Sequence, residues 1–172
     1  MCRRDEIFPR SIAYRGTAIP VRRDIVHGRL KLPDFMHSRT LGITLGSTGT
    51  ELLLFVTYRP HGSHFYSSDI HTIFDDHTPT ILAGDLSAKH TACNSRVVSP
   101  AGRQLLHDAE DYGYEVLGLD TPSHVPTDTC FGVDVLDIVL CHRLPSPIHV
   151  EVLYDMDTQY LSILITLGAT TH

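Results

Sequence analysis

Three aspartates stand where predicted strands begin or end, and their type and placement could support chemistry. Asp85 follows an apolar run, Asp137 lies within VDVLDIVL, and Asp157 precedes the last apolar run. Layered α/β folds build their sites at strand ends and in the loops after them. Carboxylates gathered there would bind Mg²⁺ or Mn²⁺, because hard cations prefer oxygen ligands. Such a cation would polarise a phosphoryl oxygen and help to generate hydroxide.

Each of these side chains also has a plain structural interpretation. Asp85 could cap the turn after its strand, and Asp137 could be the partner of a buried arginine or amide. Tyr58 closes the most apolar stretch of the chain and could belong to the core. The G-D-x-S sequence around Asp85 is too short to assign a function by itself.

Histidine is abundant, with twelve residues, but its spacing does not indicate a metal site. No two histidines have the H-x-x-x-H spacing that places both on one face of a helix. His61 and His64 lie in a Gly-containing loop, where we expect exposure to solvent. His90 follows Lys89 and is the best candidate for a polar contact with a substrate.

The strands that must position these groups are marked by short apolar runs between turn residues. The strongest is ELLLFVTY over residues 51–58, whose continuous apolar character predicts burial on both faces. Together with residues 41–45 and the turn residues between them, it predicts a hairpin. Further strands are expected over residues 17–21, 80–83, 114–117, 133–140, 150–153 and 161–167.

Two helices are indicated by capping residues. The Ser-Ser-Asp sequence from Ser67 can cap a short helix that runs through Phe74. Ser99 precedes Pro100, a favoured pair at a helix start, and Gly113 marks the end of that helix. The mixture of strands, hairpins and helices predicts an α/β sandwich with sheets inside and helices outside.

The composition is that of an ordinary globular domain. The chain has 172 residues, 42% of them hydrophobic and 20% charged, which suits one domain with a real core. No apolar run reaches the ~18 residues needed to cross a bilayer, and the N-terminus lacks the apolar core of a secretory signal. We therefore expect an intracellular protein, nuclear or cytoplasmic, not secreted and not in a membrane. Its four cysteines are then expected to be reduced thiols.

Charge is unevenly distributed along the chain. Residues 1–31 carry eight Lys and Arg against three Asp and Glu, whereas the remainder carries six against seventeen. An acidic body does not favour bulk binding of nucleic acid, but it is compatible with a metal enzyme. The basic start could contact phosphate or could simply be a solvated end.

Four segments together resemble one family. ILAGDLSAKHTACNSRVVSPAGRQLL resembles the signature of endonuclease domains from jockey-like non-LTR retrotransposons, the LINE elements, in which G-D-(F/L)-N-A-K-H precedes N-S-R and G-R-x-L. TPSHVPTD with DVLDIVL resembles their P-T-H-x-P and D-V-L-D-I-x-L segments. TAIPVRRDI and VTYRPHGS resemble their G-T-A-I-x-V-R and Y-x-P-P-G-S segments. The motifs occur in the family's order and cover residues 16 to 167.

The resemblance implies both a fold and an activity. The wider group is the endonuclease/exonuclease/phosphatase superfamily, related to apurinic endonucleases, whose fold is a four-layer α/β sandwich. It implies hydrolysis of a DNA phosphodiester with Mg²⁺, or Mn²⁺, which nicks target DNA so that reverse transcription can start. Residues 16–168 would form this domain, between a basic start at residues 1–15 and a tail at residues 169–172.

Matching positions carry the family's roles over to this chain. Tyr58 matches a phosphate-contacting tyrosine, and Asp85 matches the Asp of G-D-x-N that positions or activates the attacking water. Ser123 stands at a site threonine and keeps the hydroxyl, and Asp137 matches the Asp of the L-D-I segment. Lys89 and His90 match the A-K-H that follows G-D-x-N, near the DNA face. Separately from the resemblance, we expect Arg15, Arg22 and Arg23 to contribute weak, salt-sensitive contacts to DNA.

Two motifs of the resemblance are altered. Ser87 replaces the asparagine of G-D-x-N and cannot offer both an amide donor and a carbonyl acceptor. Tyr160 replaces the histidine of the terminal S-D-H-x-P motif, and a phenol with an ordinary pKa near ~10 is a poor acid or base at neutral pH. Gln159 replaces the aspartate of that motif, so Asp157 is the nearest carboxylate that could serve as a ligand.

The beginning of the family pattern is also altered. The family opens with a strand that carries an asparagine and a second strand that ends in a metal-binding glutamate, and the resemblance begins after both. Glu6 is the only glutamate before residue 16. The resemblance therefore implies a sandwich without its first strands and a weakened Mg²⁺ site.

Three functions remain open on the sequence. The first is a retrotransposon-derived endonuclease domain whose DNA-nicking activity is impaired or lost. The second is a non-catalytic module that kept the fold to bind nucleic acid or protein. The third is an active nuclease with unorthodox ligands.

Overall fold

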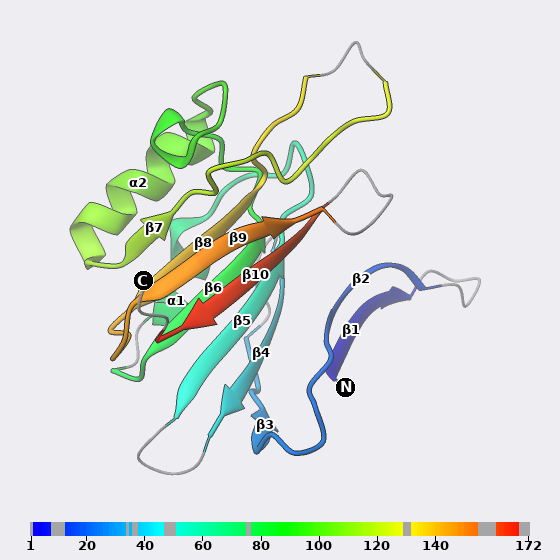
Figure 1. The fold of residues 1–172 in the computed structure, drawn as a ribbon, viewed down its shortest axis with the longest axis vertical. Helices are drawn as coiled ribbons and strands as arrows, with labels where there is room; N and C mark the ends of the chain where they lie inside the picture. The colour runs from blue at the N-terminus through cyan, green and yellow to red at the C-terminus, as the bar shows by residue number, and fades with distance from the viewer. Residues whose placement is uncertain are drawn as a thin grey trace.

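A six-stranded mixed sheet forms the centre of the molecule (Figure 1). In this computed structural model, residues 2–7, 13–33, 35, 38–46, 51–74, 77–128, 132–154 and 161–168 are described, with only the backbone for 2–7 and 13–16. The strands in spatial order are β3 (His27–Arg29), β4 (Arg39–Leu45), β5 (Leu52–Tyr58), β6 (Thr80–Asp85), β8 (Asp137–His142) and β7 (Glu115–Leu117).

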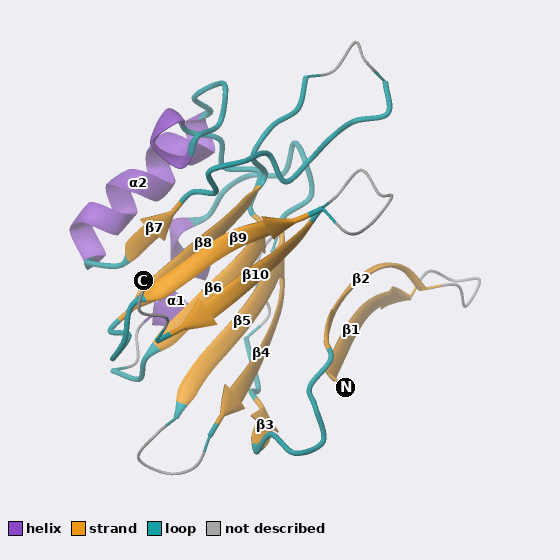
Figure 2. Ribbon diagram, in the orientation of Figure 1, coloured by secondary structure: helices purple, strands orange, loops and turns teal. Residues whose placement is uncertain are grey.

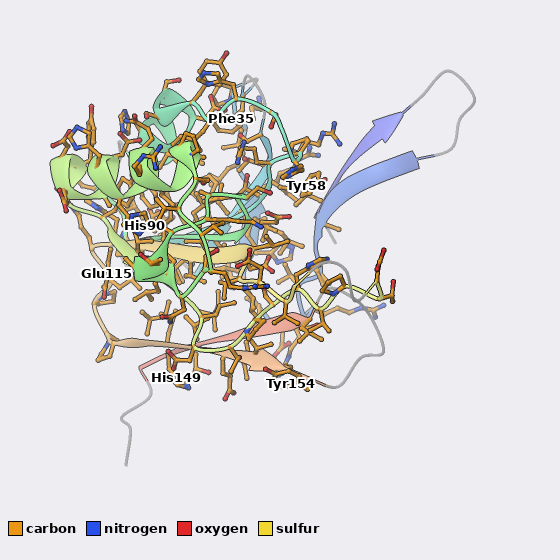
Figure 3. The ribbon with its side chains drawn as sticks, turned by 90° about the horizontal axis from the view of Figure 1, so that it is seen from above. Phe35, Tyr58, His90, Glu115, His149 and Tyr154 are labelled. Atoms are coloured by element: carbon orange, nitrogen blue, oxygen red, sulfur yellow. The ribbon has the colours of Figure 1, made fainter. Side chains whose placement is uncertain are left out.

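Both described helices cover one face of this sheet. They are α1 (Ser67–Phe74) and α2 (Pro100–Tyr112), and a short 3₁₀ turn, η1 (Thr91–Cys93), precedes α2. The main core lies between these helices and the sheet, where Ile73 and Leu105 join the buried residues Leu82 and Leu140. Figure 3 shows the helices on one side of the sheet and two further strands on the other.

Two hairpins lie on the opposite face. β9 (Ile148–Leu153) pairs antiparallel with β10 (Ser162–Leu167), and this pair covers Ile81, Ala83 and Val139 of the central sheet. β1 (Cys2–Ile7) pairs antiparallel with β2 (Ala13–Ile19), whose Ile19 packs against Leu41 and Ile43 of β4. The α/β class is confirmed, and in the described part of the chain neither helix covers the outer side of β9 and β10.

Both predicted helices are present, and α2 has the predicted capping residues. The Ser99 hydroxyl accepts a hydrogen bond from the Gly102 amide at 3.0 Å, and Pro100 opens α2. Gly113 adopts a left-handed φ of 71° and ends the helix. At Gly102 the helix approaches the loop before it so closely that a Cβ would lie 2.0 Å from the Lys89 carbonyl oxygen.

Each predicted strand has a counterpart in the predicted order, but the boundaries differ and two further strands are present. The hairpin of β4 and β5 has the expected pairing. Residues 133–136 were expected in a strand, but β8 starts only at Asp137. β1 and β3 were not predicted, because CRRDEI and HGR lack an apolar pattern. No helix among the described residues has the length and apolar character needed to span a membrane.

Candidate active site at the end of the central sheet

Three predicted site residues form one row across neighbouring strands. Tyr58 is the register partner of Asp85 in the parallel pair β5–β6, and Asp85 is the partner of Asp137 in the antiparallel pair β6–β8. Paired residues project their side chains to the same face of a sheet. The row therefore stands on the face that carries β9 and β10, at the end where the connecting loops gather (Figure 2).

A hollow of about 750 Å³ opens beside this row. Tyr58 and Asp85 line it, and Asp137 instead lines an apolar cavity of about 450 Å³ that also includes Ile163 and Ile165 of β10. The hollow thus joins one carboxylate of the row with the loops, while the other lies deeper against apolar side chains. Polar residues that complete its lining are His61, Ser87, Lys89, Arg96, His124, Thr127, Asp128 and Asp134.

The Asp85 carboxylate is oriented by Ser87. Its Oδ1 accepts a hydrogen bond from the Ser87 amide at 2.7 Å and from the Ser87 hydroxyl at 2.9 Å. Burial raises the pKa of Asp85, while the Ser87 hydrogen bonds and the charges of Arg59 and His124 lower it. Ser87 has a left-handed φ of 45°, a conformation that asparagine adopts more readily than serine. The replacement predicted from the sequence therefore also has a backbone cost.

Arg59 fixes the turn that carries Asp85. Its Nε donates to the Leu86 carbonyl at 2.5 Å, its Nη2 donates to the Ser87 carbonyl at 2.8 Å, and its Nη1 donates to the Ser63 carbonyl. The Arg59 amide also donates to the Asp85 carbonyl at 2.8 Å. Burial lowers the pKa of Arg59, and the neighbouring Asp85 charge raises it. One buried guanidinium thus joins the loops that follow β5 and β6.

Ser123 holds the main chain at the start of β8. Its hydroxyl accepts hydrogen bonds from the amides of Leu136 and Asp137, each at 3.2 Å, and its side chain is fully buried. Burial raises the pKa of Asp137 to about 6; the hydrogen bond to Ser123 opposes this rise, and the charge of Asp85 adds to it. The Leu161 amide donates to the Ser123 carbonyl at 2.8 Å, so the start of the last strand reaches the same place.

The two carboxylates of the row fit a hard divalent cation. Burial has the largest effect in raising the pKa of Asp137, and the negative charge of Asp85 adds to it. A cation near both carboxylates would relieve the repulsion between them. Mg²⁺ commonly binds proteins through one or two carboxylates and keeps several waters. No group of three His, Cys, Asp or Glu that could hold a metal occurs among the described residues. Asp157, the other predicted ligand, lies outside them.

The predicted DNA-contacting residues are dispersed. Lys89 lines the hollow, but its Nζ lies 2.7 Å from Oδ2 of Asp134, so a carboxylate partly neutralises its charge. His90 caps η1 by accepting a hydrogen bond from the Ala92 amide at 3.0 Å, and Figure 3 shows it well away from Tyr58.

Arg22 and Arg23 do not line the hollow. Arg22 and Arg23 are exposed on the segment between β2 and β3, and Arg22 forms an ion pair with Asp24 at 2.7 Å. The side chain of Arg15 lies outside the described residues, as does Tyr160.

The residues of the site that were not predicted from the sequence include Arg59, His124 and Asp134. Asp134 accepts hydrogen bonds from the Ser95 hydroxyl at 2.7 Å and the Val135 amide at 2.9 Å, in addition to its ion pair with Lys89. Burial acts to raise the pKa of Asp134, but the hydrogen bonds from Lys89, Ser95 and the Arg96 amide hold it below its ordinary value. All three lie inside the quoted motifs: Arg59 follows Tyr58, His124 follows Ser123, and Asp134 opens the DVLDIVL segment that contains Asp137. That placement was the available signal in the sequence.

Comparison with known proteins places the fold. No protein-family model matches the chain, and a search of curated proteins gives no match. Among solved structures, the endonuclease domain of TRAS1, a telomere-specific non-LTR retrotransposon, matches with a TM-score of 0.70 and 18% identity, over 84% of this chain and 67% of that chain. A Cimex nitrophorin in its ferrous NO complex matches with a TM-score of 0.50 and 13% identity, over 83% and 63%. The chain has the fold of a non-LTR retrotransposon endonuclease domain.

Proposed function

We propose that this chain is a retrotransposon-derived endonuclease domain that binds DNA and hydrolyses its phosphodiester bonds slowly, with a divalent cation. The observation that carries the proposal is the row of Tyr58, Asp85 and Asp137 across β5, β6 and β8. The likeness to the TRAS1 endonuclease domain supports the same chemistry. Three groups from separate motifs in one register row are better explained by a common task than by three separate structural roles.

Each member of the row has a chemical role in this proposal. Asp85, oriented by Ser87, accepts a proton from the attacking water. The Tyr58 hydroxyl donates a hydrogen bond to a phosphate oxygen at the mouth of the hollow. Asp137, held by Ser123, is the deeper carboxylate beside Asp85. A bound Mg²⁺ or Mn²⁺ would neutralise charge on the phosphoryl oxygens, with Asp137 as its ligand.

The rate of hydrolysis is expected to be low because Ser87 cannot provide the side-chain amide that an asparagine would provide at this position. Its hydroxyl and its amide both bind Oδ1 of Asp85, so no side-chain amide is left to stabilise charge on the phosphate. Loss of one such donor costs about 10²–10³ in rate. Asp85 matches the aspartate of the family motif, so the remaining activity should depend on its carboxylate.

A plasmid-nicking assay tests this proposal. The unaltered chain, in large excess over supercoiled DNA with Mg²⁺, should produce slow nicking that EDTA abolishes. Asp85→Asn keeps the size of the side chain but cannot accept the proton, and it should abolish nicking while DNA affinity is retained. Absence of nicking by the unaltered chain, or equal nicking by Asp85→Asn, would contradict the proposal.

A non-catalytic DNA-binding module is the second candidate. It is favoured by the small number of metal ligands among the described residues and by the exposed Arg23 beside Arg22. This function predicts weak, salt-sensitive binding without nicking. Fluorescence anisotropy with the double variant Arg22→Ala, Arg23→Ala measures it, and unchanged affinity would remove these two arginines from the interface.

A further inference from the structure

The hollow beside Asp85 is lined by two imidazoles, and they differ in how they are held. His61 is exposed in the loop after β5, whereas His124 is half-buried in the segment that leads to β8. His124 directly follows Ser123, whose hydroxyl binds the main chain of Asp137. The sequence therefore brings His124 to the hollow from the same segment that fixes the deeper carboxylate.

The main chain of His124 is anchored on both sides. Its amide donates to the Asp134 carbonyl at 3.1 Å, and the Asp134 amide donates back to the His124 carbonyl at 3.1 Å. The Asp134 side chain in turn binds Lys89 and the Ser95 hydroxyl, each at 2.7 Å. A residue held in this way can present its ring at a constant position, which general acid–base catalysis requires.

His124 also acts electrostatically on the candidate base. Besides the Ser87 hydrogen bonds and Arg59, its charge counteracts the burial that raises the pKa of Asp85. Both residues line the hollow, so a phosphodiester bound there would have a carboxylate and an imidazole within its reach. Groups with opposite proton-transfer roles on the same substrate are the usual arrangement for hydrolysis.

We propose that His124 is a catalytic residue, the general acid that protonates the leaving sugar oxygen. The proposal rests on the proposed phosphodiester hydrolysis. Water loses a proton to Asp85 and forms a bond to phosphorus, and the bond between phosphorus and the sugar oxygen breaks. The electron pair of that bond stays on the sugar oxygen, which takes a proton from the His124 imidazolium. Solvent then carries the proton from Asp85 back to His124, so the site returns to its starting state.

A leaving-group substitution tests this role. A DNA duplex is first cut by the unaltered chain to map a cleaved bond, and that bond is then synthesised with a bridging sulfur in place of the leaving oxygen. His124→Gln should lower cleavage of the oxygen duplex by about 10²-fold or more. It should cleave the sulfur duplex within a few-fold of the unaltered chain, because a thiolate leaves without protonation. His107→Gln, exposed on α2, should behave as the unaltered chain on both duplexes.

Each outcome decides between the proposals. Equal cleavage of the oxygen duplex by His124→Gln, with cleavage still dependent on Asp85, would overturn the role of His124 and leave the proposed function standing. A loss that sulfur does not restore would also overturn it, since His124 would then act on folding or binding. If His61→Gln, and not His124→Gln, lost cleavage of the oxygen duplex and regained it on the sulfur duplex, His61 would be the general acid and the role of His124 would be overturned. No cleavage dependent on Asp85 would overturn both proposals.

Discussion

Replacement of Arg59 by methionine should destabilise the protein more than replacement of any exposed arginine. Arg59 is 6% exposed and donates three side-chain hydrogen bonds to the carbonyls of Ser63, Leu86 and Ser87. A hydrogen bond from a charged group contributes about 1.5–3 kcal/mol. Methionine keeps most of the apolar stem but leaves three carbonyls without this donor. Because such losses are not additive and water can reach part of the hollow, we expect about 3–5 kcal/mol.

Urea unfolding followed by circular dichroism measures this loss. The midpoint should fall while the slope stays constant, since the area exposed on unfolding changes little. Arg22→Met is the matched control, because Arg22 pairs with Asp24 at an exposed surface and should lose no more than about 0.5 kcal/mol. A loss below about 1 kcal/mol for Arg59→Met would refute the view that this guanidinium holds the two loops together.

Two further predictions concern the carboxylate row and a helix contact. The pKa of Asp137 rises from its ordinary 3.8 to about 6 in the fold, so the folded state binds more protons in that window and stability falls as pH increases through it. Asp137→Asn removes this penalty, so the stability of the variant relative to the unaltered chain should increase by about 3 kcal/mol as the pH rises from 3.5 to 8, measured by urea unfolding. A gain that is independent of pH would contradict this assignment. Gly102→Ala should destabilise by about 2 kcal/mol, although alanine normally favours a helix, because its Cβ would lie 2.0 Å from the Lys89 carbonyl oxygen. At Gly28 a Cβ meets nothing within 4 Å, so Gly28→Ala should change stability by less than about 0.5 kcal/mol, and a stabilised Gly102→Ala would contradict the packing argument.

Elements with a strong local signal were predictable from the sequence. The apolar run of β5 and the Ser99-Pro100 start of α2 identified their elements within one residue. Strands that depend on pairing were not predictable, because β1 and β3 carry no apolar alternation and exist through their neighbours β2 and β4. Residues 133–136 carry an apolar pattern but do not belong to β8. The Asp134 carboxylate accepts a hydrogen bond from the Val135 amide and pairs with Lys89, contacts that favour a loop over a strand.

The candidate site was predictable in its members but not in its connections. Motif order indicated Tyr58, Asp85 and Asp137, and their alignment became visible only with the register of three strands. Arg59 and His124 could not be found by periodicity. The role of Arg59 depends on the loop carbonyls that it contacts, and the role of His124 depends on its position beside Asp85 in the hollow. Contacts between loops that are distant in the sequence produce no periodic pattern of residues.

The register of β6 makes the row vulnerable to one kind of change in particular. Ile81, Ala83 and Asp85 alternate with Leu82, which belongs to the core beneath the helices. Insertion or deletion of one residue at the start of β6 would shift its register by one, which would turn Asp85 toward α1 and α2 and Leu82 toward the opposite face. A substitution in β6 alters the contacts of one side chain, whereas such an insertion or deletion would remove the carboxylate from the row and disrupt two cores in a single event.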